Sequence, residues 1–120
     1  MEIENQIDVL HSENMEWLKK LASYSEEINS MQSSIETIAA TYTSRAVMSK
    51  IEHFQNQLII HKHRISGLKH SIKNDEKIIQ SHDNLKLESH HASAKDQVHT
   101  FEKIIGDLKL ELNQFLQQSV

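Results

Sequence analysis

Residues 3–42, IENQIDVLHSENMEWLKKLASYSEEINSMQSSIETIAATY, decide the fold class. Alternating steps of four and three residues along this stretch meet apolar or aromatic side chains at eleven of twelve positions, and Asn14 is the exception. The twelve positions are Ile3, Ile7, Leu10, Asn14, Trp17, Leu21, Tyr24, Ile28, Met31, Ile35, Ile38 and Tyr42. Because such steps keep one stripe on one side of an α-helix, the pattern predicts a long amphipathic helix with a heptad seam.

Two further runs repeat the pattern. The second begins at Val47 and reaches His82, and the third begins at Leu87 and reaches Phe115. Together the three runs place apolar residues at 27 of 32 seam positions, although the chain is only 38% hydrophobic. Steps of five residues, from Tyr42 to Val47 and from His82 to Leu87, break the phase and mark two turns.

The phase breaks predict helices over about residues 2–42, 45–82 and 84–118, within a single domain of residues 1–120. The chain contains no proline and two glycines, so little in it interrupts a helix. The predicted fold is therefore all-α, an antiparallel three-helix bundle with coiled-coil packing. A helical hairpin that completes its bundle with another chain would use the same heptads and is the structural alternative.

In helix number, helix length and a tryptophan, Trp17, in the seam of the first helix, this architecture resembles that of a spectrin repeat. The resemblance concerns architecture alone, and no functional residue follows from it.

The predicted turns also contain residues suited to begin a helix. Ser44 suits the N-cap of the second helix, and Asp83 or Asn84 suits that of the third.

Charge is divided unevenly among the predicted helices. The net charge is −6 over residues 1–43, +4 over residues 44–82 and −2 over residues 83–120. An acidic first helix beside a basic second helix favours pairing of these two as an antiparallel hairpin.

The positions of the turns predict which seam residues face one another. Turns centred near residues 44 and 84 place Asn14 level with Asp75 and Ala94. Asn14 and Asp75 are polar exceptions in two different seams, so their coincidence predicts a buried polar layer.

Histidine is the chemically suggestive excess, with nine residues in the chain. Asp75, His82 and His91 occupy seam positions toward one end of the bundle, with His11 nearby. Two imidazoles and a carboxylate that converge in this way are candidate ligands for zinc or another divalent metal. The spacing of Glu88 and His91 also matches the carboxylate–histidine motif of di-metal bundles, but the chain has one copy where such sites need two. The alternative is a polar layer that fixes helix register.

Several apolar residues fall outside the seams. Ile59, Ile60 and Leu110 take outward heptad positions, as does Val9. The predicted turns place Leu110 level with Ile59 and Ile60, so these three residues are the candidate interaction surface. The second helix also carries a basic stretch over residues 61–73, which could meet an anionic surface.

The composition argues against most catalytic functions. The chain has no cysteine and no Gly-x-Ser-x-Gly turn, so we expect no enzyme, no catalytic residue and no cofactor. No apolar run is long enough to span a membrane, which makes the cytoplasm the expected location, and 5% aromatic content argues against nucleic-acid binding.

The leading hypothesis is a structural or protein-interaction module that binds a partner protein or itself, as a homodimer. A metal-binding bundle and a binder of anionic surfaces are the alternatives.

Overall fold

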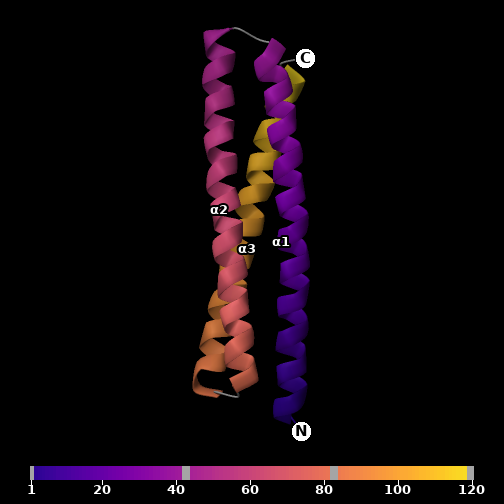
Figure 1. Cartoon of the computed structure of the whole chain (residues 1–120), viewed down its shortest axis with the longest axis vertical. Helices are drawn as coiled ribbons and strands as arrows, with labels where there is room; N and C mark the ends of the chain where they lie inside the picture. Colours follow the sequence, from indigo (N-terminus) through magenta and orange to yellow (C-terminus); the bar gives the residue numbers. More distant parts are fainter. Residues whose placement is uncertain (1, 42–43, 82–83, 119–120) are drawn as a thin grey trace.

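The computed structural model describes residues 2–41, 44–81 and 84–118, and the side chains of residues 6–41, 44–81 and 86–118. Three helices, α1 (Glu2–Thr41), α2 (Arg45–Ser81) and α3 (Asn84–Gln118), run up, down and up (Figure 1). The molecule measures 62 × 17 × 17 Å. The all-α, antiparallel three-helix bundle predicted from the sequence is thus confirmed, although residues 42 and 82 of the predicted helices lie outside the described residues.

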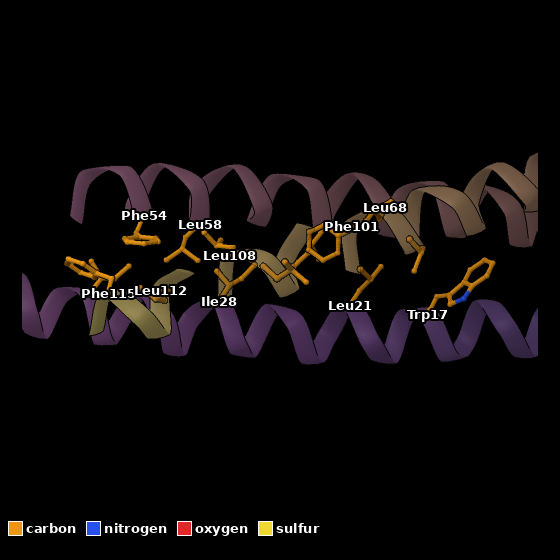
Figure 2. Packing of buried hydrophobic residues seen from close by; sticks show 14 of the residues in the cluster. Trp17, Leu21, Ile28, Phe54, Leu58, Leu68, Phe101, Leu108, Leu112 and Phe115 are labelled. Atoms are coloured by element: carbon orange, nitrogen blue, oxygen red, sulfur yellow. The ribbon is translucent and has the colours of Figure 1, made fainter. Parts of the chain in front are cut away.

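The core follows the predicted seams. The buried residues of α2 all occupy the seam positions of the second run: Ile51, Phe54, Leu58, His61, Ile65, Leu68, Ile72, Asp75 and Ile79. Apolar side chains from all three helices meet along the axis of the bundle, with Ile28 of α1 beside Leu58 and Leu108 in Figure 2. The burial of this stripe supplies most of the driving force for folding.

Near the α2–α3 turn, the register of α3 differs from the prediction by about one helical turn. Asp75 of α2 contacts His90 and His91 of α3, whereas the prediction placed Ala94 at its level. Farther from the turn, the rings of Phe54 and Phe115 lie with centroids 5.3 Å apart, which is the pairing that the predicted register gives. Since α2 ends at Ser81 and α3 begins at Asn84, the turn is centred earlier than the sequence-based register assumed.

The ion pairs that involve lysine join α1 to α3 in the described part of the chain. Lys20 and Glu27 of α1 pair with Glu102 and Lys109 of α3, at 3.7 and 3.0 Å. No Lys or Arg of α2 forms an ion pair with an acid in the described part of the chain. α1 and α2 do pack as an antiparallel hairpin, as expected, but the lysine–carboxylate pairs between helices in the described ranges join α1 to α3.

Hydroxyl groups mark the second half of α1. Ser33, Ser34, Thr37 and Thr41 each donate to the backbone carbonyl four residues earlier, over 3.0–3.2 Å. Such contacts satisfy the hydroxyl within its own helix. Beyond the turn, the carbonyl of Ser44 accepts a 2.9 Å bond from the backbone N–H of Met48, as expected of a residue at the N-cap.

Both glycines lie inside helices and have free space around them. A Cβ atom added at Gly67 or Gly106 would meet no atom within 4 Å. We expect Gly67→Ala and Gly106→Ala each to raise the free energy of unfolding by about 0.5–1 kcal/mol, because alanine is the better helix former. Urea unfolding followed by circular dichroism measures this change. A loss of stability in either variant would contradict the open environment seen here.

Candidate functional site

The candidate site is a polar cluster near the end of the bundle that holds the α2–α3 turn. Its centre is Asp75 of α2, which is fully buried. The Asp75 carboxylate accepts three hydrogen bonds: one from Asn14 Nδ2 of α1 at 2.8 Å, and one each from the Nδ1 atoms of His90 and His91 of α3, at 2.8 and 2.7 Å. One carboxylate therefore joins all three helices at a single level.

His91 connects Asp75 to a second carboxylate. Its Nδ1 lies 2.7 Å from Asp75 Oδ2, and its Nε2 lies 3.2 Å from Glu13 Oε2 of α1. Because a carboxylate only accepts, both contacts are hydrogen bonds when both ring nitrogens carry a proton. The ring also stacks on Trp17, with centroids 4.9 Å apart and an interplanar angle of 24°. Packing and hydrogen bonds together fix the orientation of this imidazole.

Asn14 extends the cluster toward the surface. In addition to its contact with Asp75, its Nδ2 donates to Glu76 Oε1 at 2.9 Å, and His11 Nδ1 lies 2.7 Å from Glu76 Oε2. Asn14 Oδ1 is buried and has no hydrogen-bond partner in the described part of the chain. The amide thus serves as a donor to two carboxylates of α2.

The environment of Asp75 favours its ionised form. Burial by itself raises the pKa of this carboxyl, because it removes water from the charge. Hydrogen bonds from His91, Asn14 and His90, with the positive charge of His91, oppose this effect, and the pKa is held below its ordinary value of 3.8. Asp75 is a buried anion stabilised by donors from the other two helices.

The predicted metal ligands are only partly brought together. Asp75 and His91 are in contact, whereas His82 lies outside the described residues. Within the described ranges, no group of three or more His, Asp or Glu side chains is arranged to hold a metal ion. The contacts that the structure shows between Asp75 and the two histidines are hydrogen bonds.

Sequence reasoning missed several members of this cluster. His90 lies outside the predicted seams, yet it is half-buried and contacts Asp75. Glu13, Glu76 and His90 each adjoin a polar seam residue in the sequence, namely Asn14, Asp75 and His91. A charged residue directly beside a polar seam position is the signal that could have found them.

His61 is a second buried polar group, nearer the middle of the bundle. It is 2% exposed, its ring lies edge-on to Phe101 at 6.0 Å, and its Nδ1 has no hydrogen-bond partner among the described residues. Burial, followed by the positive charge of Arg64, lowers the pKa of His61 from its ordinary value of 6.5. This site therefore favours the neutral imidazole.

The candidate interaction surface consists of exposed apolar side chains, as expected. Ile59, Ile60 and Leu110 are 49%, 45% and 61% exposed. Ile59 borders a groove between α1 and α2. Met15, which sequence reasoning missed, is 37% exposed, and Val9 is 56% exposed.

Comparison with known proteins adds no relative. No protein-family model, curated protein or solved structure matches this chain. Among the described residues, no helix has the length and apolar character that crossing a membrane requires.

Proposed function

We propose that the chain is a non-enzymatic structural or protein-interaction module that binds a partner protein or a second copy of itself. The observation that carries this proposal is the exposure of Ile59, Ile60 and Leu110, large aliphatic side chains on a bundle whose seam is already filled. Each gains favourable free energy when another surface covers it.

The polar cluster supports the same proposal. Asp75, Asn14 and His91 direct their polar atoms mainly at one another and at neighbouring carboxylates. A buried polar layer of this kind helps to specify one helix arrangement, at some cost in stability. The cluster thus has a role in fixing the scaffold that carries the exposed residues.

This proposal is tested by placing a charge in the candidate interaction surface and measuring the change in self-association. We expect the wild-type chain to sediment as a dimer or larger species, and Ile60→Glu to weaken the association at least about tenfold, because a carboxylate resists burial. Sedimentation equilibrium measures the association constant. Ser49→Glu adds the same charge at an exposed position of the same helix and is the matched control.

Two outcomes would decide against self-association through this surface. Identical monomers of wild type and Ile60→Glu would show that the exposed isoleucine joins no second copy. An equal loss of association in Ile60→Glu and Ser49→Glu would assign the effect to net charge and not to the apolar contact.

A further inference from the structure

The outer face of α2 carries a row of lysines without acidic partners. The basic stripe consists of Lys62, Lys69, Lys73 and Lys77, and none of them forms an ion pair with a described residue. Because successive residues of a helix are rotated by about 100°, the four lysines lie within a sector of about 80° around the axis of α2. At about 1.5 Å per residue they extend over about 22 Å along that axis. The chain as a whole has a net charge of −4, so this concentration of positive charge is local.

The basic stripe borders a groove between α1 and α2. Lys62 and Lys69 line this groove together with Ile59, and α1 contributes the uncharged residues Ser25 and Gln32. Across the groove, Lys62 donates a 3.4 Å hydrogen bond to Gln32 Oε1. The groove therefore combines an exposed aliphatic side chain with lysine charges that its own walls leave uncompensated.

We propose that this groove binds an acidic amphipathic helix of a partner protein, an inference that rests on the proposed function of an interaction module. Lys62 and Lys69 are one heptad apart, which is the repeat of the flanking positions of a helix that joins a bundle. An apolar residue of the partner would cover Ile59, while Asp or Glu one heptad apart would meet the two lysines. Such flanking pairs contribute little affinity individually, but they select the partner and its direction.

A helix fits this surface better than a broad polyanion does. Glu26 follows the groove residue Ser25 in the sequence and is exposed on α1. A nucleic-acid duplex or an anionic membrane is wider than one helix and would also meet this acidic side of α1, whose repulsion opposes binding. The chain also offers few aromatic side chains for stacking on bases.

The experiment uses the full chain and two labelled peptides of about 21 residues, three heptads each. Both carry Leu at the a and d positions; one has Glu and the other Lys at the e and g positions. We expect fluorescence anisotropy to show binding of the acidic peptide alone, and the affinity to fall as salt is added. Lys62→Glu/Lys69→Glu should weaken binding about tenfold, while Lys95→Glu/Lys103→Glu, exposed on α3, makes the same change in net charge and should have a far smaller effect.

Three results would overturn the proposal. They are equal binding of the two peptides, an equal effect of the two double variants, and tighter binding of duplex DNA or of phosphatidylserine vesicles than of the acidic peptide. Circular dichroism verifies that each variant is folded. The Ile60→Glu sedimentation result is independent of these outcomes, so a failure of the groove proposal leaves the proposed function to be judged separately.

Discussion

Asp75→Ala is expected to lower the free energy of unfolding by about 3–5 kcal/mol, the usual result of removing one partner from a buried ionic contact. The substitution leaves the donors of Asn14, His90 and His91 facing a cavity, and two of these residues are buried away from water. Because Asp75 joins all three helices, we expect the entire cooperative transition in urea to move, with little change in its slope.

Two comparisons make this prediction specific. Glu36→Ala removes an exposed carboxylate of α1 and should change stability by no more than about 0.5 kcal/mol. The triple variant Asn14→Leu/Asp75→Leu/His91→Leu removes donors and acceptor together, so we expect it to recover most of the loss or to exceed the wild type. If Asp75→Ala costs no more than Glu36→Ala, the cluster does not hold the helices together.

Asp75 also predicts that the free energy of unfolding decreases at acid pH. The folded state keeps the pKa of Asp75 below 3.8, so the unfolded chain binds more protons in that pH range. The contribution of the carboxylate is complete above pH 3.8 and is lost as the pH falls through the lower, folded-state pKa. This part of the acid destabilisation should be missing in Asp75→Ala.

His61→Leu is expected to raise the free energy of unfolding by about 1–3 kcal/mol, because it removes a buried nitrogen that has no partner among the residues that the structure describes. Leucine has nearly the volume of histidine and suits a position that faces Phe101, so little repacking is required. Thermal and urea unfolding at neutral pH measure the gain. His63→Leu, at an exposed position of the same helix, is the matched control and should change stability little.

The pH dependence of His61 has the same sign as that of Asp75 but a different range. Burial and Arg64 lower the pKa of His61, so below its ordinary pKa of 6.5 the unfolded chain binds the proton more readily than the folded chain. Stability is complete above pH 6.5 and falls as the pH drops below that value. His61→Leu should remove this loss and His63→Leu should retain it; identical curves for both variants would contradict the assignment.

The helices and their buried faces could be predicted because each depends on local pattern. Apolar spacing fixed the seams, and the five-residue steps located both turns within about a residue of the helix ends that the structure describes. The pairing of Asn14 with Asp75 also followed, since polar exceptions in two seams at one level have to meet. Their hydrogen bond, at 2.8 Å, is the contact that such a coincidence predicts.

The remaining contacts depend on quantities that the seam pattern does not contain. The register of α3 near Asp75 depends on the length of the second turn. The sequence-based register placed Ala94 opposite Asp75, whereas the structure places His91 there, about one turn earlier in α3. The ion pairs depend on the direction in which each long side chain extends from its helix. The side chain of Glu27 extends toward α3 and pairs with Lys109 there. The net charge of a helix does not show in which direction its charged side chains extend.

The hydroxyl groups in the second half of α1 give the molecule sidedness. Ser33, Ser34, Thr37 and Thr41 have already committed their donors to their own helix, so this flank offers a neighbour few free donors, and its side chains are short. The opposite is true of α2, which presents lysines and aliphatic groups to solvent. The two flanks of the rod therefore differ in chemical character, with short hydroxyl side chains whose donors are used internally on one, and lysines and aliphatic groups on the other.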